Sequence, residues 1–242
     1  MAMPREKNLS NCGFGAIHRP LTNYQFKMIN LDNYHRILAE LKPFKAQLVA
    51  VSKTKPVEDI SDLMQNGQKI FGENYVQELL EKANIIQEAD WHFIGHLQSN
   101  KVKSILPVTK LIHGVDSIKL LQEINKQAEK QNLIANCLLQ IYIASEETKF
   151  GLDYNEAEEF LTGPLTDQLT NVNVKGFMGM ASNTEDNNLI QAEFRTLKKF
   201  YDKFKQLGLD TLSMGMTSDY MIALNEGSTM IRIGSAIFGS RI

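Results

Sequence analysis

The chain has 242 residues, of which 43% are hydrophobic and 22% are charged, and this composition is typical of a globular protein with one large core or two small ones. Its 26 basic and 28 acidic side chains give a formal net charge of -2, which argues against a general attraction to nucleic acid or to an anionic membrane. The two cysteines lack metal-ligand spacing, and no apolar run is long enough for a signal peptide or a membrane span. We therefore expect a cytoplasmic protein without a metal site.

The first 27 residues differ from the rest of the chain. They are rich in Asn, Pro, Gly and Arg and show no sustained hydrophobic period. After Met28 the apolar residues fall on one helical face, which predicts a helix that begins near Asp32. We expect residues 1–27 to be a disordered extension or a start-site artefact, with Met28 as a candidate native start, and residues 28–242 to form the folded domain.

From Gln47 onward, short apolar runs alternate with longer segments of helical period. Eight runs predict strands, and they read QLVAVSK, KIFGEN, WHFIGH, LIHGVDS, CLLQIYIA, VKGFMGM, TLSMGMT and MIRIGSAIFG. Residues 56–67, 74–86 and 190–204 have the apolar spacing of amphipathic helices. Eight strand–helix alternations in about 200 residues predict a single (β/α)8 TIM barrel, and an open doubly wound sheet is the alternative.

Such barrels carry their functional sites at the carboxyl ends of the strands. Ser52 and Lys53 lie at the end of the first predicted strand and Glu73 and Asn74 at the end of the second, while strand seven carries Ser213 and Gly215 and strand eight carries Arg232, Gly234 and Ser235. If Arg232 faces inward it is a buried cation that needs a partner, whereas an outward arginine would form a surface ion pair. The glycine, the hydroxyl and the backbone N–H groups that follow Arg232 lie where a barrel binds phosphate, after strands seven and eight.

A lysine, an amide, an arginine and a phosphate cradle at one barrel mouth match the groups of pyridoxal 5′-phosphate. This cofactor offers an aldehyde for a lysine Schiff base, a phenolic oxygen, a ring nitrogen and a phosphate dianion. A lysine with the ordinary pKa near 10.4 is only about 0.1% neutral at pH 7.5, so the reacting lysine benefits from a desolvated or cation-rich site. Strand alternation does not choose between Lys53 and Lys55, because they share a phase. Lys55 precedes a proline, which favours a boundary position outside the mouth.

Several motifs occur in order along the chain, and they read AVSKTKP, FGENYVQE, WHFIGHLQSNK, KFG at residues 149–151, LSMGMTSDY and GSTMIRIGSAIFG. With these motifs the chain closely resembles the YggS/PROSC family of pyridoxal-phosphate homeostasis proteins, from about Ala50 to Arg241. The resemblance implies a single-domain barrel like the amino-terminal domain of alanine racemase (fold type III), without the carboxyl-terminal β-domain of that enzyme. It also implies pyridoxal phosphate as the cofactor.

The resemblance implies a role for each site residue. The Schiff-base lysine of the family is the first lysine of SKTKP, which is Lys53 here. By the same resemblance Asn74 lies beside the cofactor ring and Arg232 faces its pyridine nitrogen. The residues that the resemblance assigns to the phosphate are Ser213, Gly234 and Ser235.

Other positions in the motifs stay outside this set. His92 and Met180 lie among apolar strand residues, where a core position is the favoured interpretation. The sequence departs from the family pattern at His96, where proline is common, and in SMGMTSDY, which has one residue more than usual. The longer loop leaves the phosphate roles of Thr217 and Ser218 open.

Two classes of function follow from these residues. Arg232 stays protonated and has no acceptor, so it cannot hold a proton on the ring nitrogen, and the cofactor is then a weaker electron sink. The family resemblance implies a non-catalytic carrier or regulator that binds pyridoxal phosphate through Lys53 and takes part in vitamin B6 and amino-acid or keto-acid balance, and we favour this class. It would act as a monomer, with pyridoxal-phosphate-dependent apoenzymes as partners. The alternative is a small racemase-like enzyme with Tyr75 or His96 as a second base, although the sequence ends at Ile242 without room for the β-domain that supplies this base in racemases.

Overall fold

The structure is a computed structural model that describes residues 29–145 and 150–239. Within these residues eight parallel strands close into a barrel in chain order, and the first strand pairs with both the second and the eighth. The predicted (β/α)8 barrel is confirmed and the doubly wound alternative is wrong. The expected extension at residues 1–27, and Lys149 of the KFG motif, lie outside the described residues.

Each of the eight predicted runs overlaps one strand, although β3, β5 and β6 begin one or two residues before their run. The strands are β1 (Gln47–Val51), β2 (Ile70–Glu73), β3 (Asp90–Phe93), β4 (Leu111–Val115), β5 (Ala135–Gln140), β6 (Val172–Met178), β7 (Thr211–Ser213) and β8 (Met230–Ile233). The eighth run is longer than its strand, because its second half forms a short helix over Ser235–Phe238. Most strands are four or five residues long, and polar residues follow several of them directly.

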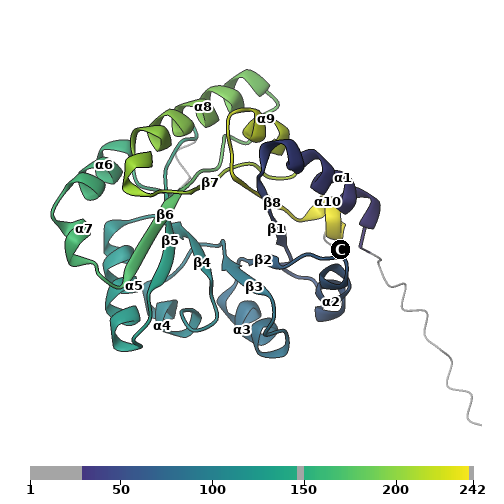
Figure 1. The fold of residues 1–242 in the computed structure, drawn as a ribbon, viewed down its shortest axis with the longest axis horizontal. Helices are drawn as coiled ribbons and strands as arrows, with labels where there is room; N and C mark the ends of the chain where they lie inside the picture. The colour runs from purple at the N-terminus through teal and green to yellow at the C-terminus, as the bar shows by residue number, and fades with distance from the viewer. Residues whose placement is uncertain (1–28, 146–149, 240–242) are drawn as a thin grey trace, which may run out of the picture.

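Helices form an outer ring around the strands (Figure 1). They are α1 (Leu31–Leu41), α2 (Val57–Gln65), α3 (Val76–Ile85), α4 (Val102–Ile105), α5 (Ile118–Lys130), α6 (Tyr154–Thr162), α7 (Leu165–Gln168), α8 (Asn187–Lys203), α9 (Tyr220–Asn225) and α10 (Ser235–Phe238), with 3-10 turns η1 (Lys42–Phe44), η2 (Ser99–Lys101) and η3 (Lys205–Leu207). The helix predicted near Asp32 is confirmed as α1. Its N-cap residue Asn30 donates a backbone hydrogen bond to Ile237 O of α10 (2.8 Å). None of the described helices combines the length and the apolarity needed to cross a membrane.

The core has two parts. The larger part fills the space between the strands and the helices, and the apolar stripe of α8 is buried there. A smaller cluster brings together side chains from five strands, as expected for the inside of a barrel, and its members are Val49, Leu111, Leu138, Met178 and Met230. Arg232 follows Met230 by two residues, so it shares this inward face, and it is only 5% exposed.

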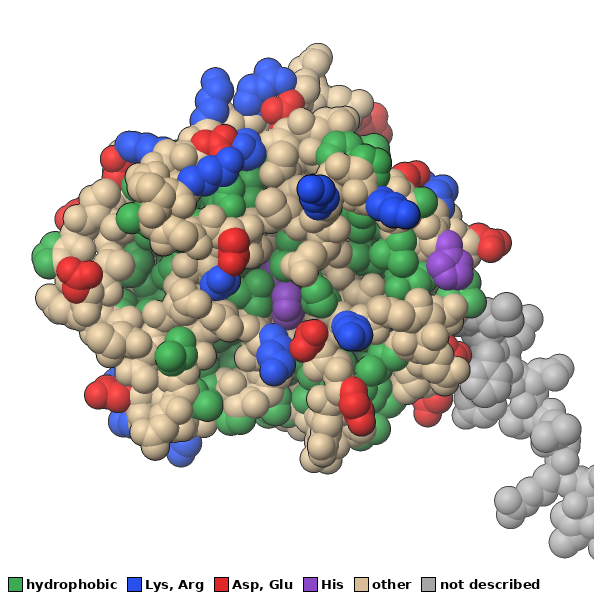
Figure 2. Space-filling view, viewed as in Figure 1, with side chains coloured by type: hydrophobic (Ala, Val, Ile, Leu, Met, Phe, Trp, Pro, Cys, Tyr) green, Lys and Arg blue, Asp and Glu red, His purple; other side chains and the backbone are tan. Residues whose placement is uncertain are grey.

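Charge is mixed on the surface. Figure 2 shows basic and acidic side chains interspersed on one face of the molecule, with hydrophobic side chains visible between them. This face therefore offers no continuous basic surface of the kind that follows a phosphate backbone.

Candidate functional site

A cavity of about 490 Å3 lies at the carboxyl ends of the strands. Five of the six predicted site residues line it, namely Lys53, Asn74, Arg232, Gly234 and Ser235. They meet because β8 pairs with β1, and β1 pairs with β2, so residues from both ends of the chain follow three neighbouring strands. Barrel closure thus gathers residues that are far apart in the sequence.

The two lysines of SKTKP lie in one tight turn but have different surroundings. Lys55 N donates to Ser52 O at 3.0 Å, which closes the turn around Lys53. The ammonium of Lys55 donates to Phe238 O (2.7 Å) and Gly239 O (3.3 Å) at the end of α10. Lys55 also lines the cavity, so the expectation that it lies outside the mouth is wrong. Its ammonium nevertheless has a structural task that holds it at the rim.

Asn74 follows β2 directly and is half-buried on the cavity wall. The segment that follows β3 comes very close to it, and a Cβ at Gly95 would lie only 2.2 Å from Asn74 O. Any side chain at position 95 would therefore displace this backbone. The side-chain Oδ1 of Asn74 is buried and has no hydrogen-bond partner among the described residues. A buried amide with an unsatisfied atom is a group that a polar ligand can complete.

Arg232 lies at the base of the cavity, and neutral oxygens accept its hydrogen bonds. Nη1 donates to Ser213 O (3.0 Å) and Ser213 Oγ (2.6 Å), and Nη2 donates to Gly179 O (3.2 Å). Burial lowers the pKa of Arg232 to about 10, while the charge of Asp219 acts in the opposite direction. The guanidinium therefore remains a cation at neutral pH, and these hydrogen bonds fix its orientation.

Ser213 does not line the cavity, although the family resemblance assigned it to the phosphate. It is fully buried, and its hydroxyl lies between Arg232 and the ring of His113, whose Nδ1 is 3.1 Å away. In the sheet Ser213 pairs with Met230, four residues before Gly234, so it lies deeper in the barrel than the Gly234 and Ser235 segment. In this position Ser213 orients Arg232.

A chain of hydrogen bonds continues from Ser213 through the barrel interior. His113 Nε2 lies 3.0 Å from His92 Nδ1. Burial lowers the pKa of His92 to about 4 and that of His113 well below its usual value, so both rings are neutral at pH 7. Because an arginine only donates, the consistent directions are donation from Arg232 to the Ser213 hydroxyl, from that hydroxyl to His113 Nδ1, and from His113 Nε2 to His92 Nδ1. The core position favoured for His92 agrees with this burial, but the sequence did not predict the chain.

The segment after β8 and the loop after β7 form the exposed side of the cavity. Ser235 Oγ lies 3.4 Å from Thr217 Oγ1, and both residues line the cavity. Ser218 instead lines a neighbouring cavity, so the structure separates two residues that the sequence left open. Met180, which we expected in the core, is half-buried and lines the cavity as well.

The two candidate second bases lie elsewhere. Tyr75 and His96 line a smaller cavity of about 350 Å3 that shares Asn74 with the first one. Tyr75 is 57% exposed. His96 Nδ1 lies 2.9 Å from a carboxylate oxygen of Asp116, and its ring stacks on Phe150 with centroids 5.1 Å apart.

Comparisons with known proteins identify the family. The family described as alanine racemase, N-terminal domain, matches residues 30–242. A pyridoxal phosphate homeostasis protein of Aquifex aeolicus is 38% identical over 201 residues, which cover 81% of this chain and 87% of that protein. The protein of the same name from Vibrio alginolyticus is 40% identical, with coverages of 82% and 88%. The chain belongs to the pyridoxal phosphate homeostasis protein family. The predicted resemblance is thereby confirmed.

Solved structures agree with this membership. PipY of Synechococcus elongatus, solved without PLP, has a TM-score of 0.80 and 32% identity, covering 86% of this chain and 99% of PipY. The same protein with PLP bound has a TM-score of 0.77. An alanine racemase of Clostridium difficile has a TM-score of 0.71 at 17% identity and is covered over 57% of its length, which shows a shared barrel fold alone.

Proposed function

We propose that this member of the family binds pyridoxal 5′-phosphate in the cavity at the carboxyl ends of the strands, with Lys53 as its covalent attachment point. We propose further that it serves vitamin B6 and amino-acid or keto-acid homeostasis as a carrier and not as an enzyme. The observation that carries the proposal is the convergence of Lys53, Asn74 and Arg232 on one cavity. The names of the relatives and the PLP-bound structure of PipY support it.

The residues present fit the chemical groups of the cofactor. The side-chain NH2 of Asn74 can donate to a phenolic oxygen beside the ring, and its buried Oδ1, which has no partner among the described residues, can accept from an N–H or O–H of a ligand. Arg232 supplies a fixed cation whose hydrogen bonds go to neutral oxygens, which suits an unprotonated ring nitrogen. The hydroxyls of Ser235 and Thr217 and the backbone at Gly234 suit a phosphate.

When bound, the cofactor supplies an aldehyde that reacts with a primary amine. Lys53 would supply that amine and hold the cofactor as an imine, with the aldehyde oxygen released as water. Lys53, Lys55 and Arg232 line the same cavity, so the lining places basic side chains around a cofactor that carries a phosphate dianion.

The lining of the cavity favours a carrier over an enzyme. Among the described residues that line it, the titratable side chains are Lys53, Lys55 and Arg232. The ammonium of Lys55 is held by two carbonyl oxygens, and an arginine has no acceptor for a substrate proton. Racemisation needs a second base opposite the first, and the candidates Tyr75 and His96 line a different cavity. The racemase-like alternative therefore has no specific support.

An absorbance spectrum of the purified protein with added pyridoxal phosphate tests the attachment. We expect a visible band that disappears on borohydride reduction, with a pyridoxyl mass on the peptide that contains Lys53. Lys53→Ala is expected to lose both signals, whereas Lys55→Ala is expected to keep the mass on Lys53. A protein that stays colourless, or a pyridoxyl mass confined to Lys55, would contradict the proposal.

We also propose that the protein acts as a monomer in the cytoplasm and passes the cofactor to pyridoxal-phosphate-dependent apoenzymes. The exposure of Thr217 and Ser235 leaves one side of the cavity open to solvent, which supports release. Reactivation of an apo-aminotransferase in the presence of a phosphatase that destroys free cofactor tests transfer. Reactivation no faster than with free cofactor would count against transfer. Light scattering at micromolar concentration measures the molar mass and so tests the monomeric state.

A further inference from the structure

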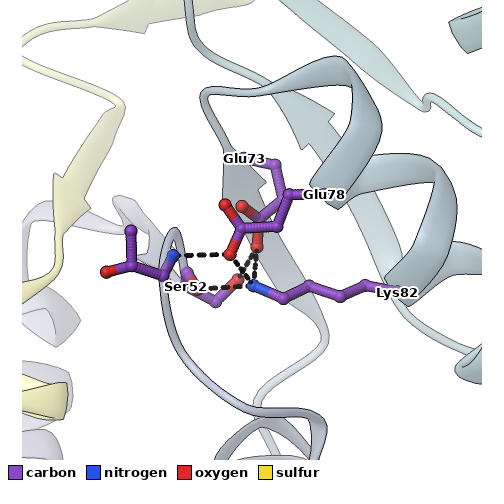
Figure 3. A network of polar contacts seen from close by, with 5 residues as sticks. Ser52, Glu73, Glu78 and Lys82 are labelled. Atoms are coloured by element: carbon purple, nitrogen blue, oxygen red, sulfur yellow. Dashed lines mark hydrogen bonds and ion pairs between the residues drawn. The ribbon is translucent and has the colours of Figure 1, made fainter.

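A buried ion cluster lies behind the turn that follows β1 (Figure 3). Lys82, on α3, has a side chain only 6% exposed, and its Nζ donates to Glu73 Oε1 at 2.8 Å and to Glu78 Oε1 at 2.7 Å. The same ammonium donates to Ser52 O at 2.7 Å. Ser52 Oγ donates to Glu73 Oε1 at 2.6 Å, and Thr54 N donates to Glu78 Oε1 at 2.5 Å. One ammonium and two carboxylates therefore bind the backbone and the side chain of this turn.

The cluster holds the residues on both sides of Lys53. Ser52 precedes it and is bound through its carbonyl and its hydroxyl, and Thr54 follows it and is bound through its amide. Lys53 has little freedom to move its backbone while both neighbours are held. Its half-buried side chain then leaves the turn towards the cavity.

Thr54 has a backbone conformation that it would not choose alone. Its φ is 62°, in the left-handed region that β-branched residues rarely adopt. Such strain persists where the surroundings impose it. The carboxylate of Glu78 accepts the Thr54 amide, and a charged acceptor makes this hydrogen bond a strong one. Glu78 is thus the group that stabilises the strained residue next to Lys53.

The cluster acts from behind the cavity and not inside it. Glu73, Glu78 and Lys82 are absent from its lining. Glu73 is fully buried, and burial raises the pKa of its carboxyl, while the Lys82 ammonium opposes this rise. Asn74 follows Glu73 directly, so the same cluster fixes a second residue of the cavity wall.

We propose that Glu78, together with Glu73 and Lys82, is a positioning residue that sets the Lys53 turn in its reactive conformation before the ligand arrives. This inference rests on the proposed function, because it takes Lys53 as the attachment point. Misplacement of a reacting group by about 1 Å can cost on the order of a hundredfold in rate. Loss of the Glu78 carboxylate is therefore expected to slow attachment at Lys53 at least about tenfold.

The rate of borohydride-trapped pyridoxyl labelling at Lys53 measures the effect on attachment. Glu78→Ala removes the acceptor and is expected to slow labelling, whereas Glu78→Gln keeps an oxygen acceptor and is expected to retain most of the rate. The double variant Glu78→Ala with Thr54→Gly is expected to recover rate, because glycine adopts a positive φ without strain. Glu81→Ala, on the exposed side of the same helix, is the matched control and is expected to label like the unmodified protein.

Hydrogen exchange of the Thr54 amide in the ligand-free protein gives a second, independent measure. We expect Glu78→Ala to accelerate this exchange at least tenfold, and Glu81→Ala to leave it unchanged. The positioning role would be overturned if Glu78→Ala were labelled at the unmodified rate. It would also be overturned if Glu78→Gln labelled as slowly as Glu78→Ala and the added Thr54→Gly change did not recover the rate. Absence of labelling in the unmodified protein would instead overturn the proposed function, and the exchange data would then decide the positioning of the turn alone.

Discussion

The two ends of the barrel have cavities of similar size, but the side chains that line them are held in very different ways. The cavity at the amino end, of about 530 Å3, is lined by Lys45, Lys110 and Lys175 among others. Lys45 and Lys110 are exposed, and Lys175 forms an ion pair with Asp210 at 2.5 Å. The cavity at the carboxyl end, of about 490 Å3, contains lysines as well, but buried hydrogen bonds hold the groups around it.

The contrast shows that neither volume nor lysine content identifies a functional site. At the amino end Lys45 and Lys110 are exposed to solvent, and Lys175 is paired with the exposed carboxylate of Asp210. At the carboxyl end Arg232 and the Lys53 turn are each held by buried partners. The polar interior chain from Arg232 to His92 reaches the amino-end cavity, so the two ends also share a hydrogen-bonded connection.

The largest expected difference between the ends concerns their ion pairs. Lys82→Met leaves the carboxylate of Glu73 buried without its cation, and loss of one partner of a buried pair costs about 3 to 5 kcal/mol. Lys175→Met breaks a pair whose side chains are 32% and 55% exposed, and such pairs contribute about 0 to 1 kcal/mol. Urea unfolding at pH 7 measures both changes. Equal losses would contradict the contrast between the ends.

The histidine chain between the ends is expected to make stability depend on pH. The pKa of His92 is about 4 in the folded protein and 6.5 in its ordinary state, so the unfolded chain binds more protons between these values. The free energy of unfolding therefore falls as the pH is lowered, by about 2 kcal/mol for His92 between pH 7 and pH 5. His113 acts in the same direction.

Urea unfolding at the two pH values, in the unmodified protein and in His92→Gln, measures this contribution. The variant is expected to lose part of the pH dependence. His35→Gln on the surface of α1, where the ring is exposed in the fold, serves as the comparison. An unchanged pH dependence in His92→Gln would show that this ring does not exchange protons on unfolding.

A smaller effect is expected from Ser213→Ala, which interrupts the chain beneath Arg232. The substitution leaves His113 Nδ1 and one guanidinium N–H without the hydroxyl, and an unsatisfied buried group costs about 1 to 3 kcal/mol. Arg232 keeps its bond to Ser213 O, so the free energy of unfolding is expected to fall by about 1 kcal/mol. Ser104→Ala, an exposed serine on α4, is the control for urea unfolding. A loss no greater than that of the control would show that the hydroxyl is dispensable.

The smallest effect is expected at the amino end. Lys110→Ala changes an exposed residue, so the free energy of unfolding should stay within about 0.5 kcal/mol of the unmodified value. The yield of pyridoxyl label at Lys53 should not change. Peptide mapping of the reduced protein checks this, and a fall in the Lys53 label would mean that the amino end takes part in binding.

Some parts of the site could be predicted and others could not, for physical reasons. Lys53 and Asn74 follow short apolar runs and Arg232 lies near the end of one, and the barrel rule places such residues at one mouth. Thr217 lines the cavity after β7, and its place in the loop was a usable but ambiguous signal. Glu78 and Lys82 have the i, i+4 spacing of an ordinary surface pair, so their burial behind Lys53 was hidden in the sequence.

The eight strands, the barrel and the family could all be recognised from the sequence, because hydrophobic periodicity and ordered motifs are local features of the chain. Three features could not be recognised there and arise on folding: Lys55 binds the end of α10, Ser213 lies under Arg232, and an ion cluster holds the lysine turn. These contacts join residues up to 184 positions apart. Their burial and their hydrogen-bond partners exist only once the barrel has closed and brought its first and last strands together.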